Sequence, residues 1–222
     1  SLYSSFYTDL KVTPAKGKTF VLIPSQVAAL HQQHSIENIS LIAEEKALLK
    51  NRDVQTVVYL KGVDDNYPRV SGVAARTNRG TYNTGTSDEP LLVAGAGIQN
   101  AVGINLDPAM PSGELTIILP KKNTGSNDPL QSMSEGNLLA SGVFTIQQDF
   151  DNTYAITNIG FVTRQMGFAA DEYSAVDIKL KEKTDPANAK TEREKLLGNN
   201  YIIATKYEQS TSLYHNMRRD NM

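Results

Sequence analysis

The segment Leu91–Pro120, LLVAGAGIQNAVGINLDPAMPSGELTIILP, decides between two folds. Its apolar start followed by Gly95-Ala-Gly97 imitates the strand, glycine turn and helix of a dinucleotide-binding site. Asn100, however, stands where that pattern needs a third glycine, and no strand, helix and acidic residue follow at the required spacing. Residues 107–113 instead predict a turn, and Glu114–Leu119 predicts a strand. We therefore expect the two glycines to serve backbone geometry and not phosphate binding.

The composition describes a globular chain without a strong charge. Of its 222 residues, 40% are apolar, which suffices for one large domain or two small ones. Lys and Arg total 22 against 24 Asp and Glu, so nothing predicts a nucleic-acid partner. The absence of cysteine excludes disulfides, thiolate metal sites and cysteine nucleophiles, but leaves the compartment open.

The sequence shows neither a membrane span nor a signal peptide. No apolar run approaches the roughly 18 to 20 residues of a membrane span, and the start has no signal-peptide layout. The chain begins at Ser1 without an initiator methionine and stops at Met222. We therefore expect a segment cut from a longer protein.

The two ends of the chain share one pattern of elements. The sequence predicts strands at Phe6–Val12, Thr19–Ile23, Ile36–Ala47, Asp53–Gly62, Ala175–Leu180 and Tyr201–Lys206. It predicts one helix with Ser25 as its N-cap, and a second from Asp185-Pro186 to Gly198. This order predicts an α+β fold with a split βαβ, ferredoxin-like unit, interrupted by a β-rich excursion.

The excursion begins with a loop. Residues 67–90 lack periodicity and predict little regular structure. Strands are expected at Leu91–Ala94, Leu115–Leu119, Leu138–Gln147 and Tyr154–Ile159, with a turn at Asp149–Asn152. Lys121–Asn137 is polar and predicts a long projecting loop, a feature that is often functional. The apolar residues in or beside it, Leu130, Met133, Leu138 and Leu139, either fold back onto the domain or meet a partner.

Catalytic, cofactor and metal sites are not predicted. His31 and His34 are three residues apart on the first predicted helix, but two ligands make no site and His215 is distant. Residues 149–153 suggest a calcium loop, yet Tyr154 stands where such a loop requires glycine. Nucleophile elbow, phosphate loop and zinc-protease helix are all missing. We expect a non-enzymatic domain.

Four motifs in one order resemble a known family. They are Leu60–Tyr67 (LKGVDDNY), Val93–Ile104 (VAGAGIQNAVGI), Leu115–Pro120 (LTIILP) and Gly142-Val-Phe144. Together they resemble the extracytoplasmic domain of lipoprotein-releasing, Lol-type permeases within the MacB- and FtsX-like group of ABC transporter permeases. The tail from Ser212 to Arg218 is similar to the segment that leads into the family's second membrane helix.

This resemblance implies two subdomains and a membrane setting. Residues 1–66 and 173–222 would form a mixed α/β subdomain called Porter, and residues 67–172 an inserted β-rich subdomain called Sabre. The domain would lie on the periplasmic side of the bacterial inner membrane, between two membrane helices. It would hold no cofactor, because ATP binds a separate cytoplasmic subunit or domain. Its partners would be that ATPase and a second permease copy.

The resemblance also assigns a role to the long loop. In the lipoprotein-releasing branch the corresponding loop captures a periplasmic lipoprotein carrier. This chain has Asn127–Leu130 where the family often has TPxG, and keeps the proline. The residues expected to contact a partner are Lys121, Lys122, Pro129, Leu130 and Met133. Three alternatives are a MacB-like efflux permease, an FtsX-like regulatory permease and a free-standing extracellular binding module.

Overall fold

The computed structural model describes residues 3–107, 109, 113–122 and 127–211. Part of the predicted turn (108 and 110–112), part of the predicted loop (123–126) and the tail with His215 lie outside these residues. The chain forms two compact units. The first contains the described residues of Ser1–Ile42, Asp64–Gly72 and Ala170–Met222, and the second contains Ala43–Val63 and Val73–Ala169. No helix in the described ranges is both long and apolar enough to span a membrane.

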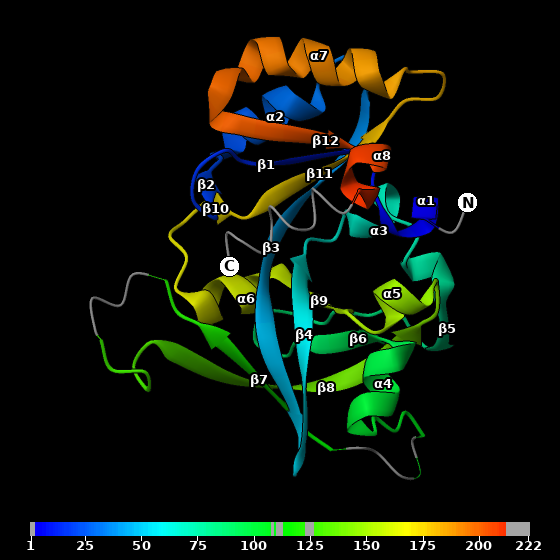
Figure 1. Ribbon diagram of the computed structural model, residues 1–222, viewed down its shortest axis with the longest axis vertical. Helices are drawn as coiled ribbons and strands as arrows, with labels where there is room; N and C mark the ends of the chain where they lie inside the picture. Colours follow the sequence, from blue (N-terminus) through cyan, green and yellow to red (C-terminus); the bar gives the residue numbers. More distant parts are fainter. Residues whose placement is uncertain (1–2, 108, 110–112, 123–126, 212–222) are drawn as a thin grey trace. The chain divides into compact units, whose positions relative to one another are not determined.

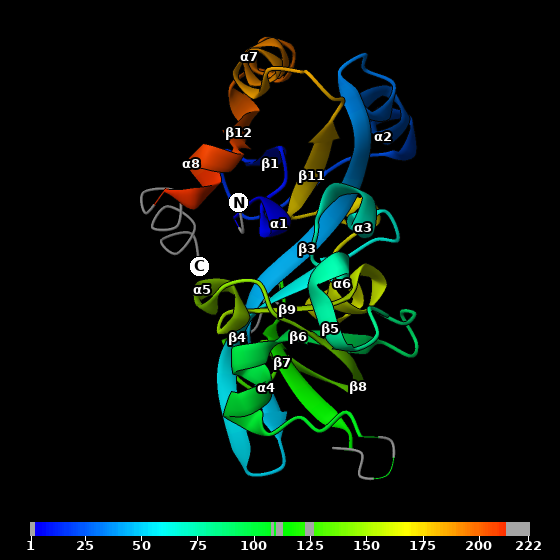
Figure 2. The same ribbon diagram turned by 90° about the vertical axis from the view of Figure 1, so that its right-hand side faces the viewer.

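The first unit is a four-stranded sheet with its two longer helices on one face (Figures 1 and 2). Its strand order is β12-β1-β11-β3, and every neighbouring pair is antiparallel. The strands are β1 (Leu10–Pro14), β3 (Ile36–Asn51, whose first part lies here), β11 (Ala175–Leu180) and β12 (Tyr201–Thr205). The helices are α1 (Tyr3–Phe6), α2 (Pro24–His31), α3 (Tyr67–Val70), α7 (Pro186–Leu197), η2 (Gly198–Asn200) and α8 (Lys206–Ser210). A separate ladder joins β2 (Phe20–Val21) to β10 (Glu172–Tyr173).

The core of this unit lies between the sheet and the two longer helices, α2 and α7. Leu10, Ile39 and Ile178 from three neighbouring strands are buried there with Ala189 of α7. Burial of these apolar side chains is the main force that holds the helices on the sheet.

The boundaries of α7 and α2 test two predictions. The Asp185 carboxylate caps α7 by accepting a hydrogen bond from the Ala187 N–H at 3.3 Å, and Gly198 ends the helix in a positive-φ conformation, as predicted. The prediction for α2 was wrong. Proline at position 24 already begins the helix, so Ile23 and not Ser25 is the N-cap residue. The helix ends at His31, which leaves His34 in the following turn.

The second unit contains a closed ring of strands. Its elements are the rest of β3, β4 (Val54–Val63), η1 (Ala74–Arg76), β5 (Thr77–Gly80), β6 (Leu91–Gly95), α4 (Ala96–Val102), β7 (Leu115–Pro120), β8 (Met133–Phe144), α5 (Gln148–Asp151), β9 (Tyr154–Asn158) and α6 (Ile159–Met166). Each strand pairs with the next in the order β3-β4-β9-β6-β8-β7, and β7 pairs back to β3. This six-stranded barrel has β5 attached to the edge of β8.

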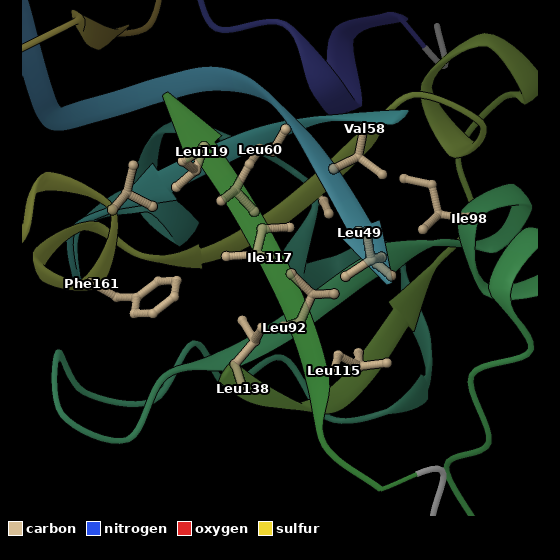
Figure 3. Close-up of a cluster of buried hydrophobic side chains, with 14 of the residues drawn as sticks. Leu49, Val58, Leu60, Leu92, Ile98, Leu115, Ile117, Leu119, Leu138 and Phe161 are labelled. Carbon is tan, nitrogen blue, oxygen red and sulfur yellow. The ribbon is translucent and has the colours of Figure 1, made fainter. Parts of the chain in front are cut away.

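The barrel interior holds the largest apolar cluster (Figure 3). Leu115, Ile117 and Leu119 alternate along β7 and are fully buried, and they meet Leu49 of β3 and Phe161 of α6 in the same cluster. The period-2 pattern of β7 therefore sends every second residue inward. Because β7 pairs with Leu48–Lys50 of β3, residues 43–63 belong to the second unit. The sequence-based boundaries had placed them in the first.

The glycines of the opening segment are explained by close packing. β6 runs directly into α4, and Gly95 is the N-cap residue of this helix. A Cβ at Gly95 would lie 2.2 Å from the carbonyl oxygen of Asp151, and one at Gly97 would lie 1.8 Å from Asn152 Oδ1. Both neighbours belong to the α5 region, so another segment of the chain occupies the approach to these glycines. The φ of Gly95 is −62°, which shows that the need is for space and not for a left-handed backbone.

Two other expectations fail. The predicted loop at 67–90 contains α3 in the first unit and η1 and β5 in the second. The predicted hairpin turn at Asp149–Asn152 is mostly the short helix α5, and β9 pairs with β4 and β6 and not with β8. The Asp151 carboxylate accepts a hydrogen bond from the Ile146 N–H at 2.9 Å and closes this helix locally. Burial raises the pKa of Asp151, and its backbone hydrogen bonds oppose that rise.

Candidate partner-binding hairpin

The candidate site lies on the antiparallel hairpin of β7 and β8. The register pairs Leu115 with Leu138 and Ile117 with Gly136 on the inner face, and Pro120 with Met133 on the outer face. β8 begins at Met133, so the predicted loop of 121–137 is shorter and ends at Ser132. The outer face and the turn that follows are the parts of the hairpin available to a partner.

The start of β8 was missed because its inward residues are small. A Cβ at Gly136 would lie 2.6 Å from Phe161 Cζ, so α6 supplies the apolar side chain at this position. Ser134 also points inward, and its hydroxyl donates a hydrogen bond to Gln165 Oε1 of α6. Met133 points outward. The strand therefore has polar or small residues inside and an apolar residue outside, the reverse of the usual pattern.

The tip of the hairpin is shaped by hydrogen bonds around Asp128. Its carboxylate accepts from the Leu130 N–H at 3.0 Å, and its carbonyl accepts from the N–H groups of Gln131 and Ser132, each at 3.1 Å. The Ser132 hydroxyl donates to the Pro129 carbonyl at 2.9 Å. Aspartate and proline are both typical of such turns, because one bonds the local backbone and the other fixes φ. These local hydrogen bonds define the shape of the turn at residues 128–132.

The turn presents Leu130 to solvent. Its side chain is 87% exposed, and Met133 at the start of β8 is 40% exposed. Pro129 and Lys121 are also exposed. The apolar residues beside the loop were expected either to fold back onto the domain or to face a partner. Leu130 and Met133 face outward, whereas Leu138 is buried in the core.

The two lysines differ in their environment. The Lys121 N–H donates to the Ser132 carbonyl at 2.7 Å and joins the two arms of the hairpin. The Lys122 N–H donates to the Met166 carbonyl at 2.8 Å, and its Nζ lies 5.9 Å from the centre of the Phe168 ring, a cation–π distance. Lys122 is therefore anchored to the end of α6, and only part of its side chain is exposed. The sequence spacing alone gave no sign of this contact.

The outer face of the hairpin adds residues that the sequence did not single out. Ile118 and Pro120 of β7 lie on the same face as Met133 and are half-buried. We define the hairpin tip as the outward residues Lys121, Pro129, Leu130 and Met133. It combines exposed apolar side chains with one positive charge.

The described residues bring together no metal site. Among them there is no group of three histidine, cysteine, aspartate or glutamate side chains that could hold an ion. His31 ends α2 and His34 follows in a turn, and neither is joined by a third ligand. Nothing in this part of the chain assigns a cofactor.

Comparison with known proteins gives the fold and no relative in sequence. No protein-family model and no curated protein sequence matches the chain. The periplasmic region of MacB from Actinobacillus actinomycetemcomitans superposes with a TM-score of 0.60 at 13% identity, over 96% of this chain and 94% of that one. The extracellular domain of the noncanonic ABC-type transporter YknZ from Gram-positive bacteria gives 0.55 at 12% identity, over 89% and 99%. The chain therefore has the mixed α/β fold of these two transporter domains.

Proposed function

We propose that the chain is the extracytoplasmic domain of an ABC transporter permease, on the periplasmic side of the bacterial inner membrane. The observation that carries this proposal is the fold likeness to two transporter domains over nearly their whole length. The ordered motifs between Leu60 and Phe144 support it independently, because they rest on the sequence.

The two units fit the subdomains that the family resemblance implies. An antiparallel sheet in the order β12-β1-β11-β3, with α2 and α7 on one face, is the arrangement expected of a split ferredoxin-like Porter. The six-stranded barrel formed mainly by the excursion would be Sabre. The proposed boundaries remain residues 1–66 and 173–222 for Porter and 67–172 for Sabre, although residues 43–63 belong to the second compact unit.

The hairpin tip is the proposed partner site of this domain. Because the Leu130 side chain is 87% exposed, covering it with a partner surface would bury apolar area and favour binding. Lys121, Lys122, Pro129, Leu130 and Met133 are the proposed contact residues, with Lys122 acting mainly as an anchor of the loop. The proposed partner is a periplasmic lipoprotein carrier, and the proposed process is lipoprotein release or export.

The domain itself would be non-enzymatic. Hydrolysis of ATP would occur on a cytoplasmic subunit or domain, and a second permease copy would complete the transporter. Movement of the membrane helices would reach the partner through rigid-body motion of the subdomains.

A second candidate is efflux of the MacB type, which the likeness to the MacB periplasmic region favours. In that case the hairpin tip would contact an adaptor protein of an outer-membrane channel. A regulatory permease of the FtsX type, with a cell-wall hydrolase as partner, would share the fold. A free-standing binding module would need no membrane helices at all.

The full-length protein separates a permease domain from a free-standing module. We expect an apolar run of about 20 residues immediately outside each end of the chain. After detergent extraction, the tagged protein should co-purify with an ATPase subunit, unless the same chain carries its own ATPase domain, and with a second permease. Recovery of the full-length protein from the aqueous fraction, with no apolar run on either side, would reject the permease proposal.

A further inference from the structure

An open groove of about 330 Å³ lies within the first unit, whereas the hairpin tip belongs to the second. One wall is α2, with Val27 and Ala28, and the floor includes Leu41 of β3. The other end is polar and is formed by Asn66, Asp171 and Tyr173. Its volume falls in the range of small-molecule sites, which are mostly apolar with a few converging polar groups.

The polar end is built by the short β2–β10 ladder, which Figure 1 shows as two adjacent strands. Tyr173 pairs with Phe20, and the Leu22 N–H donates to the Asp171 carbonyl at 2.8 Å. Asp171 itself has a φ of 59°, in the left-handed region that few residues other than glycine adopt. Aspartate is among the few non-glycine residues that adopt this conformation, usually as single turn residues. The turn before β10 thus sets the position of Asp171 at the groove.

The polar side chains at this end are not used by the fold. Within the described part of the chain, no residue forms a hydrogen bond with the side chain of Asn66, Asp171 or Tyr173. Close by, Asp64 is held by the Ser40 hydroxyl at 2.7 Å and by the Leu41 N–H at 2.9 Å. Burial raises the pKa of the Tyr173 phenol, and Asp171 and Asp64 raise it further. This agrees with a negative potential at the polar end.

His31 of α2 also lines the groove, but no lysine or arginine is among its described lining residues. An anionic ligand would therefore meet the Asp171 carboxylate with no lysine or arginine to balance it. A cation would gain an ion pair with Asp171 and could place its N–H groups on the oxygens of Asn66 and Tyr173.

We propose that this groove binds a small organic cation with an apolar body. The apolar part would lie between α2 and β3, and the ammonium group would lie beside the Asp171 carboxylate. The proposal does not depend on the function of the hairpin.

The test uses three probes of equal length, hexylammonium, hexanol and hexanoate, titrated into the isotopically labelled chain and followed by amide chemical shifts. We expect saturable shifts at α2, Leu41 and β10 with hexylammonium, weaker binding of hexanol and none of hexanoate. Asp171→Asn should weaken hexylammonium binding about two- to fivefold, as for an ion pair at an open site. Asparagine tolerates the left-handed backbone, so the fold should survive. Asp53→Asn, at an exposed acid in the β3–β4 turn, is the matched control and should change nothing.

A second pair of variants tests the apolar wall. Ala28→Phe should fill the groove and abolish binding, whereas Ala29→Phe, at the adjacent exposed position outside the lining, should not. The proposal is overturned if hexylammonium gives no saturable shifts in the groove, or if hexanol or hexanoate binds equally well. It is also overturned if Asp171→Asn and Ala28→Phe both bind like the wild-type chain.

Discussion

The same substitution at two leucines of one hairpin should have opposite consequences. Leu119 of β7 is fully buried in the barrel, whereas Leu130 at the hairpin tip is 87% exposed. Replacing either by alanine removes the same atoms. Only Leu119→Ala leaves a cavity in a packed core.

The magnitudes follow from these environments. Leu119→Ala should lower the free energy of unfolding by about 2–5 kcal/mol, the usual range for a buried leucine. Leu130→Ala should change it by less than about 0.5 kcal/mol, as for surface positions. If a partner buries Leu130, the alanine variant should lose about 1.5–3 kcal/mol of binding free energy, or roughly 10- to 150-fold in affinity.

Urea denaturation followed by circular dichroism measures the first two values without any knowledge of the partner. A destabilisation above about 1 kcal/mol for Leu130→Ala would show that this side chain packs against the domain. The reasoning that makes it a partner contact would then be refuted. A stable Leu119→Ala variant would refute the assignment of β7 to the barrel core.

Three further predictions concern packing and ionisation. Gly95→Ala should destabilise the second unit by about 1–3 kcal/mol, because its Cβ would lie 2.2 Å from the Asp151 carbonyl oxygen; an unchanged urea midpoint would contradict the close packing. Gly136→Ala should displace the Phe161 ring, and unchanged ring proton shifts in the NMR spectrum would argue against that contact. Burial raises the pKa of Glu208, but Lys190 at 2.7 Å and Thr205 outweigh it and lower the pKa below the usual 4.5. The ionised form of Glu208 therefore stabilises the fold above the usual pKa of 4.5. The wild-type chain should have a larger free energy of unfolding than Glu208→Gln at neutral pH, and this difference should disappear as the pH falls through the lowered pKa. A difference that does not change with pH would contradict the ion pair.

Local signals predicted several elements of the fold. The limits of α7 follow from Asp185, proline and Gly198, because capping is decided by neighbouring residues. The strand-to-helix step at Gly95 is equally local. Closure of the barrel was not predicted, since β7 pairs with Leu48–Lys50 of β3, a contact between distant parts of the chain. Apolar periodicity describes faces and does not specify which strands become neighbours.

In the candidate sites, too, features set by neighbouring residues could be predicted, and contacts between distant segments could not. The position of the hairpin tip could be predicted, because a polar segment with Pro129 separates two strands. The start of β8 and the anchoring of Lys122 could not, since both depend on α6 through Phe161, Gln165 and Met166. The groove in the first unit was missed entirely. Its polar end brings Asp171 close to α2, about 140 residues earlier in the chain, and no sequence motif marks that meeting.

The most direct test of the proposed role is photocrosslinking in cells that produce the full-length protein. A photoreactive amino acid at Leu130 or Met133 should capture one periplasmic protein. The same amino acid at Leu139, which is 51% exposed but lies further along β8, should not. Capture of a lipoprotein carrier would support lipoprotein release, and capture of a channel adaptor would support efflux. Equal capture at all three positions, or none at Leu130 and Met133, would contradict the assignment of the hairpin tip as the partner site.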